Sequence, residues 1–574
     1  MSKTIASAKV IGQRVLNSTT KLINVYAPEI AAEAVPGQFV NVKVCKNTAP
    51  LLRRPFGVAG VNKAEGSITM IYRIIGEATH ILADVCSGDE LSIVGPLGHG
   101  FDMSAKKPLL VGGGLGLAPL LFLAEGFGEG NTDILMGGRS AEELFWTKLY
   151  ESLSKNIYLT TDDGSVGTKG TVMALLPQLL KEGGYDCVYV CGPVPMMRAV
   201  ANACLEGRKM SGISGKIHGL RSGCVPVLCL RRHWQAHQGL QGRSGVLGRG
   251  GRRMVKALYD GRLAVDIAGL KMATPVTTGS GTFGFGLEFT DFLDLEKVGA
   301  VTVKGTSLEP AAGNKGQRAV ETPSGMLNCI GLENPGSEYF LEHTLPELKK
   351  YNVPVIVNIY GHTPEEYGAV AKKLDVDGVD AVEINISCPN VKEGGIVFGT
   401  VPEAAAEVVR AVKANTGKMV IAKLSPNVTD IVVMAKAVEA AGADAISMIN
   451  TLLGTKIDIE RQRPVLGNVT GGLSGPAVRP VAVRLVYQVA QAVHIPIIGM
   501  GGIMCAEDAI EFMLAGASAV AVGTANFVQP DIAETIAYGM LAYLDRHNAQ
   551  NISEIVGLAL PNGKKSMPLF NEAE

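Results

Sequence analysis

The chain has 574 residues, of which 47% are hydrophobic and 19% are charged, and its formal net charge is -1. This composition is typical of globular proteins, and the length suggests three or four domains, because one hydrophobic core rarely organises so many residues. The near-neutral charge argues against nucleic acid or an acidic surface as a partner and indicates small-molecule partners.

The first residues, MSKTIASAKVIGQRV, have no apolar core followed by a small-residue cleavage site, and no segment offers about 18 uninterrupted apolar residues. We therefore predict a cytoplasmic protein that does not bind a membrane. The ten cysteines include no CxxC pair. Reduced thiols are expected for such a pattern.

Short alternating apolar segments run from Ala6 to about Val94 and are separated by Gly, Pro and Asn. They predict a small antiparallel β-barrel, assigned to residues 1–103. From Lys107 onward apolar strands alternate with helical stretches, which predicts a parallel α/β sheet in residues 104–212.

The next stretch, residues 213–253, fits neither pattern. No Asp or Glu occurs between Glu206 and Asp260, whereas arginines accumulate among Gly, Gln and His. This stretch could be a linker or a basic arm that binds nucleic acid. The scarcity of lysine and the single aromatic residue, Trp234, favour the linker.

Strand and helix alternate again in residues 254–574, and the apolar strands end in polar residues or glycine. Eight such segments occur in order: TPVTTGSG, AVTVKGTS, VPVIVNIYG, AVEINISCPN, MVIAKLSPN, AISMINT, IPIIGMGG and AVAVGTAN. Helical stretches separate them, which predicts an eightfold TIM-type βα barrel and an α/β fold class. Such barrels place their sites at the C-terminal ends of the strands.

The segment NISCPN places Asn385 and Cys388 at the end of one predicted strand. A thiolate there could take a proton from carbon, although a free thiol has a pKa of about 8.5 and must first be deprotonated. A lone cysteine near a strand end is more often a buried small hydrophobe. Other strand ends carry further polar or glycine residues: Lys304, Asn358, Lys423, Asn450, Thr451, Gly501, Gly502, Gly523 and Thr524. Together they predict a pocket for an anionic cofactor.

The segments GSGTFGFG, PSGMLNCIGLEN, VEINISCPNVK, KLSPNVTDI, GGLSGPA, GMGGI and VAVGTANF resemble, in this order, class 1 dihydroorotate dehydrogenases. The resemblance covers nearly all of residues 254–574. It implies an FMN-dependent oxidoreductase of pyrimidine biosynthesis that acts on a CH–CH bond. It further implies that Cys388 takes a proton from C5 of dihydroorotate while C6 delivers hydride to N5 of FMN, which yields orotate.

The same resemblance implies the binding residues. Those for the substrate are Lys304, Asn328, Cys329, Ile330, Gly331, Leu332, Asn385, Asn450 and Thr451. Those for FMN are Ser280, Lys304, Gly305, Asn358, Asn385, Lys423, Ile449, Gly475, Gly501, Gly502, Gly523 and Thr524. The alternative is another FMN barrel, such as a dihydropyrimidine or dihydrouridine reductase. The segments NCIGLEN and NISCPNVK favour an orotate-sized ring.

The first half offers weaker motifs. In LLRRPFGV, Arg54 could pair with a pyrophosphate, although an Arg before Pro is more often merely solvated. In VGGGLGLAPL, glycines between a strand and a helix can aim amides at a phosphate. The same sequence is also consistent with an ordinary glycine-rich turn between a strand and a helix. The segment CGPVPMM at a later strand end supports a nicotinamide-side site.

With YRIIGEATHIL and GPLGHGF, these motifs resemble the FAD- and NAD-binding electron-transfer subunit that accompanies the class 1B enzyme, over residues 1–212. The implied FAD residues are Arg54, Pro55, Phe56, Gly57, Tyr72, Arg73, Ala78 and Thr79, and the implied NAD residues are Gly112, Gly113 and Gly114. Electrons would then pass from FMN to FAD and NAD. An electron-transfer flavoprotein module that serves other partners is the alternative. We also expect a homo-oligomer.

Two positions depart from that subunit. Gly57 stands where the family usually has a hydroxyl residue, and Ala78 replaces the usual glycine before Thr79. Both departures weaken the expected FAD contacts.

That subunit normally ends with a [2Fe-2S] loop, and such a cluster needs four thiolate ligands. Here only Cys224 and Cys229 occur in residues 213–253, so we assign no metal ligand. One hypothesis is that this stretch was translated in a shifted frame. A forward shift of one nucleotide permits CCAC at 226–231 and GKPTKVCKDGPVF at 234–248. Met254 would then begin a separate catalytic subunit, and sequencing the DNA tests this.

Overall fold

The computed structural model describes residues 3–209, 218–219, 227–231, 261–386 and 395–561. The chain divides into two compact units, residues 1–46 with 53–245, and residues 47–52 with 246–574. The predicted fold class is confirmed. An antiparallel barrel and a largely parallel α/β sheet form the first unit, and a βα barrel forms the second.

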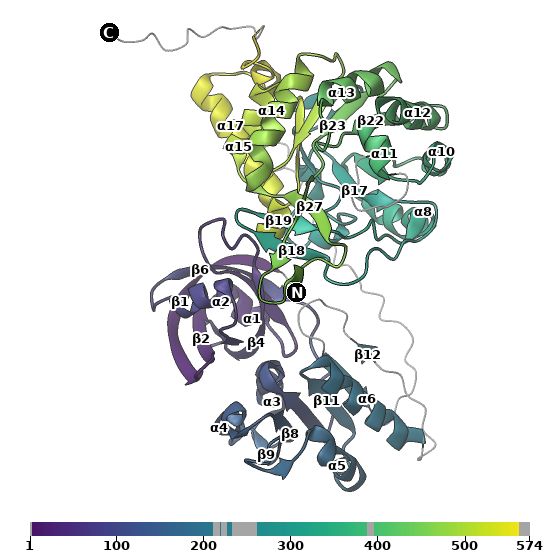
Figure 1. The fold of residues 1–574 in the computed structure, drawn as a ribbon. Helices are drawn as coiled ribbons and strands as arrows, with labels where there is room; N and C mark the ends of the chain where they lie inside the picture. Colours follow the sequence, from purple (N-terminus) through teal and green to yellow (C-terminus); the bar gives the residue numbers. More distant parts are fainter. Residues whose placement is uncertain (1–2, 210–217, 220–226, 232–260, 387–394, 562–574) are drawn as a thin grey trace. The chain divides into compact units, whose positions relative to one another are not determined.

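The first unit begins with a closed antiparallel barrel whose strand order is β1-β2-β5-β4-β3-β6 (Figure 1). Its elements are β1 (Thr4–Asn17), β2 (Thr20–Tyr26), α1 (Pro28–Glu33), β3 (Phe39–Lys43), β4 (Arg54–Asn62), β5 (Ser67–Arg73), α2 (Glu77–Ala83) and β6 (Glu90–Leu97). Alternate residues such as Ile23 and Val25 on β2 are fully buried. This period of two places one face of each strand in the barrel core.

The second part of this unit is a sheet with the order β10-β9-β8-β7-β11-β13-β12. Its strands are β7 (Pro108–Gly113), β8 (Thr132–Gly138), β9 (Ser154–Thr161), β10 (Thr168–Lys169), β11 (Cys187–Cys191), β12 (His218–Gly219) and β13 (Val227–Arg231). Its α-helices are α3 (Leu117–Phe127), α4 (Thr147–Tyr150), α5 (Leu176–Glu182) and α6 (Val194–Lys209). β7 to β11 pair in parallel, whereas β13 runs antiparallel to β11. Part of the stretch for which a linker was expected is therefore a strand, as its β-favouring residues allow.

The second unit is built on eight parallel strands in the order β16-β29-β28-β23-β22-β21-β20-β17. They are β16 (Val276–Thr278), β17 (Val301–Thr306), β20 (Val355–Ile359), β21 (Ala381–Asn385), β22 (Met419–Lys423), β23 (Ala445–Met448), β28 (Ile497–Met500) and β29 (Ala519–Val522). Each predicted segment contains one of them. A parallel bridge between Thr277 and Ala300 nearly closes the barrel, and the Thr302 amide donates to Thr278 Oγ1 at 2.9 Å.

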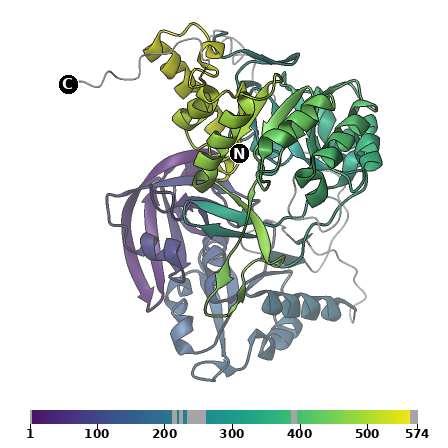
Figure 2. The ribbon, with the colours of Figure 1, turned by 45° about the horizontal axis from the view of Figure 1, so that its top comes forward.

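Helices surround these strands (Figures 1 and 2). They are α8 (Gly336–Tyr339), α9 (Leu345–Leu348), α10 (Pro364–Lys373), α11 (Gly395–Thr400), α12 (Pro402–Lys413), α13 (Ile431–Ala440), α14 (Arg479–Ala490), α15 (Ala506–Leu514), α16 (Ala525–Val528) and α17 (Ile532–His547). On α12 the buried residues Ala405, Val408, Val409 and Val412 recur at helical spacing, so one face packs on the strands.

The N-terminal end of the barrel is filled and covered. Buried residues at the strand starts, including Ile356, Ile421 and Ile498, form one cluster with Ile267 and Leu270. The last two lie on a hairpin of β14 (Val265–Ile267) and β15 (Leu270–Met272). Apolar side chains of the described residues therefore fill the barrel at the N-terminal ends of its strands.

An additional antiparallel sheet, which was not predicted, belongs to the second unit (Figure 2). Its strands, in order, are β18 (Ala319–Thr322), β19 (Gly325–Asn328), β27 (Thr470–Ser474) and β24 (Leu452–Thr455), and a short hairpin of β25 (Ile457–Asp458) and β26 (Arg463–Pro464) follows β24. Within the described ranges, no helix is both long enough and apolar enough to cross a bilayer.

Candidate functional site

A cavity of about 370 Å³ lies at the C-terminal ends of the barrel strands. The barrel residues expected at the site that line it are Ser280, Lys304, Gly305, Asn328, Ile330, Gly331, Leu332, Asn358, Asn385, Lys423, Ile449, Asn450, Thr451, Gly475, Gly501, Gly502, Gly523 and Thr524. They come from strand ends and loops that are up to about half the chain apart in sequence. The parallel arrangement brings these residues together at one end of the barrel.

Two expected residues are not among these. Cys388 lies outside the described residues. Cys329 is fully buried, and its thiol donates to the Gln317 carbonyl oxygen at 3.6 Å. It packs with Leu327 and Leu466 in a small core cluster, so its side chain faces away from the cavity that Asn328 and Ile330 line.

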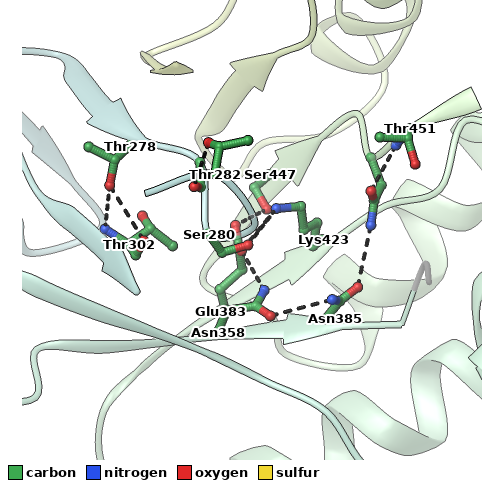
Figure 3. Close-up of polar contacts among 12 residues, drawn as sticks. Thr278, Ser280, Thr282, Thr302, Asn358, Glu383, Asn385, Lys423, Ser447 and Thr451 are labelled. Atoms are coloured by element: carbon green, nitrogen blue, oxygen red, sulfur yellow. Dashed lines mark hydrogen bonds and ion pairs between the residues drawn. The ribbon is translucent and has the colours of Figure 1, made fainter. Parts of the chain in front are cut away.

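A buried carboxylate, Glu383 on β21, contacts Asn358 and Lys423, two residues that line the cavity (Figure 3). Its Oε1 accepts hydrogen bonds from Asn358 Nδ2 at 2.6 Å and from Lys423 Nζ at 3.1 Å. Its Oε2 accepts from Ser447 Oγ at 2.7 Å. A buried charge is tolerated only when it is paired and hydrogen-bonded, and Glu383 meets both conditions.

Lys423 connects this carboxylate to the cavity. Its Nζ also lies 3.3 Å from Ser280 Oγ, and its side chain is only 7% exposed. An ammonium group has three protons to donate. Among the described residues, Glu383 and Ser280 accept two of them, which leaves one proton for a ligand in the cavity.

The carboxamides form a chain that runs from this carboxylate across the strand ends (Figure 3). Asn385 Nδ2 donates to Asn358 Oδ1 at 3.4 Å, and Asn450 Nδ2 donates to Asn385 Oδ1 at 3.4 Å. The Thr451 amide donates to Asn450 Oδ1 at 2.8 Å. The donors therefore all point in one direction, toward Glu383.

The opposite side of the cavity is rich in glycine. A Cβ added at Gly523 would meet only Thr282 Oγ1, at 4.0 Å, so the backbone there borders open space. Gly502 has a φ of +87° and packs against the Gly475 carbonyl. Thr524 Oγ1 donates to Ser474 Oγ at 2.8 Å. Backbone amides and hydroxyls in such a cradle suit a phosphate group.

An ion pair supports this glycine-rich side. Arg479, at the start of α14, pairs with the buried carboxylate of Asp508. The other oxygen of Asp508 accepts from the Met504 amide at 2.8 Å. Because Gly502 lies directly against Arg479, the pair holds the loop after β28 against the loop before α14.

The remaining wall is formed by the segment after β17 and by the additional sheet. Lys304, at the end of β17, lines the cavity, as do Arg318 and Glu333. The last two form an ion pair of 2.7 Å. Asn328 Nδ2 donates to the Gly472 carbonyl at 3.3 Å. This wall presents cationic and amide groups, which suit a small anionic ring.

In the first unit, Arg54, Pro55, Phe56 and Gly57 lie on β4. A Cβ at Gly57 would meet only Pro119, at an ordinary 3.6 Å. The surrounding atoms therefore leave room for a side chain at position 57, where the electron-transfer subunit usually has a hydroxyl residue.

Tyr72 lies in the core of the antiparallel barrel, and its hydroxyl donates to Gln13 Oε1 at 2.6 Å. Burial raises the pKa of this phenol well above its usual value, with a smaller contribution from Asp84. Arg73, the next residue, has a buried Nε with no hydrogen-bond partner among the described residues.

The other two residues expected to hold FAD lie on α2. Ala78 packs its methyl group in the barrel core, which gives a structural reason for its replacing glycine. Thr79 Oγ1 accepts from the Gly76 amide at 3.1 Å, so its side chain stabilises the start of the helix.

The glycines expected to hold NAD lie where β7 ends. A Cβ at Gly112 would clash with Leu117, and one at Gly113 would meet Met196 Sδ at 2.8 Å. Gly114 has a φ of +57° and nothing within 4 Å of an added Cβ. The first two glycines therefore serve packing, and the third borders open space.

The cysteines of the first unit were considered as ligands for a metal cluster. Cys224 lies outside the described residues, and Cys229 lies on β13, where it pairs with Tyr189. Burial raises the pKa of the Cys191 thiol, in CGPVPMM, to about 12. In the described part of the chain no group of three or more His, Cys, Asp or Glu side chains could hold a metal ion.

Sequence reasoning missed three residues that organise the site: Glu383, Ser447 and Asp508. A signal existed for Glu383, because it is the only charged residue in the apolar strand AVEIN. Its partners Asn358 and Ser447 could not be read from the sequence, because they depend on the register of neighbouring strands.

Comparison with known proteins adds an independent finding. A family model described as "Dihydroorotate dehydrogenase" matches residues 262–544. The "Dihydroorotate dehydrogenase B (NAD(+)), catalytic subunit" of Geobacter sp. (strain M21) is 62% identical over 296 residues, which cover 51% of this chain and 97% of that relative. The protein of the same name from Desulforamulus reducens is 60% identical over 298 residues, which cover 52% of this chain and 98% of that relative.

Among solved structures, a dihydroorotate dehydrogenase from Eimeria tenella in complex with ferulenol is similar at a TM-score of 0.44 and 22% identity, over 52% of this chain and 89% of that chain. The sequence relatives carry the assignment, since they are matched over nearly their whole length. The chain therefore belongs to the dihydroorotate dehydrogenase family, and its C-terminal half is a catalytic subunit of the B (NAD(+)) type.

Proposed function

We propose that the chain oxidises dihydroorotate to orotate in de novo pyrimidine biosynthesis and passes the electrons through FMN and FAD to NAD⁺. The observation that carries the proposal is the convergence of 18 barrel residues expected at the site on one cavity. Membership of the family supplies the substrate and the acceptor.

The cavity fits FMN at both of its ends. The open backbone at Gly523, with Ser474 and Thr524, would hold the phosphate. Lys423 and Asn358 would hold the polar edge of the ring system, where the described residues accept two of the three Lys423 protons. When bound, FMN supplies the hydride acceptor that the protein itself lacks.

The substrate would lie against the amide-rich wall. Asn328, Asn385 and Asn450 offer donors and acceptors to the ring, and Lys304 offers a positive charge to the carboxylate. Cys388 follows Asn385 by three residues in the sequence. We propose it as the base that takes the C5 proton.

We further propose that the first unit binds FAD and NAD. The partnerless Nε of Arg73 is a donor that a bound diphosphate could satisfy. The open space at Gly114 would admit the nicotinamide nucleotide. We place the domain boundaries at residues 1–103, 104–212, 213–253 and 254–574, and we predict a cytoplasmic homo-oligomer.

The test is a pair of assays on the full chain with dihydroorotate, one with NAD⁺ and one with an artificial dye as acceptor. The proposal expects orotate in both assays. Orotate with the dye alone would mean a working barrel and a broken electron route through the first unit. No orotate in either assay would contradict the proposed function.

A further inference from the structure

In the chain of carboxamides that lines the cavity, each side-chain nitrogen donates toward Glu383 and each side-chain oxygen accepts from the other side. This order of donors and acceptors requires an explanation. A carboxamide can be turned over without changing its shape, because its oxygen and nitrogen ends have the same size. Asn358, Asn385 and Asn450 could therefore form the same contacts with every donor and acceptor exchanged. A group that can only donate or only accept, at either end of the chain of amides, favours one of the two arrangements.

Glu383 is such a group. An ionised carboxylate only accepts hydrogen bonds, so the atom of Asn358 that faces Glu383 Oε1 at 2.6 Å must be the donating Nδ2. Asn358 and Glu383 are also direct partners in the pairing of β20 with β21. Lys423 and Ser447 donate to the same carboxylate, so three side-chain donors face its two oxygens.

The orientation of Asn358 then fixes the next two amides. Its Oδ1 must face Asn385, so Asn385 turns its Nδ2 toward Asn358 and its Oδ1 toward Asn450. At the far end, the Thr451 amide donates to Asn450 Oδ1, which is consistent with the same direction. Gly305 also fits, because an added Cβ there would lie 2.9 Å from Asn358 Oδ1.

We propose that Glu383 is a positioning residue that sets the donor and acceptor order of Asn358, Asn385 and Asn450, and so selects a ring with the imide pattern of dihydroorotate. The inference rests on the proposed function for the identity of the ring. Glu383 itself does not line the cavity. It acts through the amides, and through Lys423 on the bound flavin.

Two substitutions of Glu383 distinguish a role of its charge and acceptor atoms from a role of its size. Glu383→Gln keeps the shape but introduces a donor and removes the charge, so Asn358 can turn over. Glu383→Asp keeps an acceptor-only charge but shortens the side chain. If Glu383 sets the order of the amides, the isosteric Gln variant is the more damaged. If Glu383 only fills space, the Asp variant is the more damaged.

We expect Glu383→Gln to raise the KM for dihydroorotate and the Kd for orotate by about tenfold or more, with a smaller loss in kcat. Lys423 also loses its counter-charge, so the midpoint potential of the flavin becomes more positive. In Glu383→Asp the potential stays near the wild-type value, and the KM lies between those of the other two proteins.

The matched control is Asp444→Asn. Asp444 pairs with Lys413 at 2.9 Å and accepts from the Val420 amide, near the start of β22. Lys423 lies at the end of the same strand. The control therefore removes a carboxylate–lysine pair without touching the cavity, and its KM, orotate Kd and flavin potential should remain those of the wild type.

Should Glu383→Gln not fold, Asn385→Asp breaks the amide order one link farther on with Glu383 intact, and the same loss of orotate affinity is expected. Wild-type values of KM, orotate Kd and potential in a folded Gln variant would overturn the proposal for Glu383 alone. Absence of dihydroorotate turnover in the wild type would instead overturn the proposed function. The FMN Kd and potential of the Gln and Asp variants would then still decide the role of Glu383.

Discussion

Lys423 Nζ lies 3.1 Å from Glu383 Oε1, and both side chains are less than a tenth exposed. Removing one partner of such a pair leaves a buried charge without its counter-ion. We predict that Lys423→Met lowers the free energy of unfolding of the second unit by about 3 kcal/mol.

The measurement for this pair is urea unfolding of FMN-free protein, so that flavin binding does not contribute. The double variant Lys423→Met with Glu383→Leu should recover part of the loss, since it removes both charges. A loss below about 1 kcal/mol in the single variant is what an exposed ion pair would give, and it would contradict the buried geometry.

Gly523 borders the side of the cavity that we assign to the FMN phosphate. We predict that Gly523→Ala leaves the folded protein stable, because the added methyl group meets no protein atom closer than 4.0 Å. The methyl group should raise the Kd for FMN about tenfold or more, because it occupies ligand space.

The control for Gly523 is Gly417→Ala, at an exposed turn where an added Cβ meets only Asp375 Oδ2 at 3.9 Å. Flavin titration of both FMN-free variants is the measurement. Equal FMN affinity in the two proteins would remove Gly523 from the binding site.

Cys388 is the proposed base. We predict that Cys388→Ala binds FMN as the wild type does but loses about 10²- to 10⁴-fold in kcat, the usual contribution of a general base. Steady-state assays with the dye acceptor measure this without involving the first unit. Wild-type activity would mean that another group takes the proton.

Glu125 on α3 offers a pH-dependent test in the first unit. Although the residue as a whole is exposed, partial loss of water around its carboxyl raises the pKa of that group from 4.5 to about 7. Because the raised pKa favours the protonated form in the folded state, the contribution to stability is fully present below pH 4.5 and is lost as the pH rises through 7.

We predict that Glu125→Gln reduces the pH dependence of the free energy of unfolding of the first unit between pH 4.5 and 7. The effect is smaller than the shift alone suggests, because the side chain retains contact with solvent. Thermal unfolding at several pH values measures it. Parallel curves for the variant and the wild type would show that Glu125 does not titrate in this range.

Residues 213–253 contain two cysteines, Cys224 and Cys229, and a [2Fe-2S] cluster needs four ligands. We predict that the purified chain shows flavin bands and no iron or labile sulfide. A [2Fe-2S] spectrum would require ligands from elsewhere. It would also count against a shifted frame as the reason for the missing cysteines.

The barrel strands could be predicted because each is a short apolar run that ends in polar residues or glycine. The cavity followed from the same pattern, since parallel strands end at one rim. The additional sheet could not be predicted. It pairs Met326 with Ser474, and nothing local in either segment specifies a partner so far away in sequence.

Cys329 and Tyr72 were both expected to contact a ligand, but their side chains point into a hydrophobic core. Asn328 lines the cavity, and successive residues of an extended segment point to opposite sides. Cys329 therefore faces the core cluster. Tyr72 on β5 likewise points into the antiparallel barrel, while the adjacent Arg73 does not belong to that core. A sequence motif identifies such a segment. Which of its side chains contact a ligand depends on the side of the extended backbone to which each one points.

If the cavity of the second unit is the site of dihydroorotate oxidation, dihydroorotate must reduce FMN that is bound there. Anaerobic mixing of the FMN-loaded full chain with dihydroorotate, monitored by flavin absorbance, measures this reduction. We predict that the flavin band bleaches with the wild type and with Asp444→Asn, and far more slowly with Cys388→Ala. An unchanged flavin band in the wild type would mean that this cavity does not oxidise dihydroorotate.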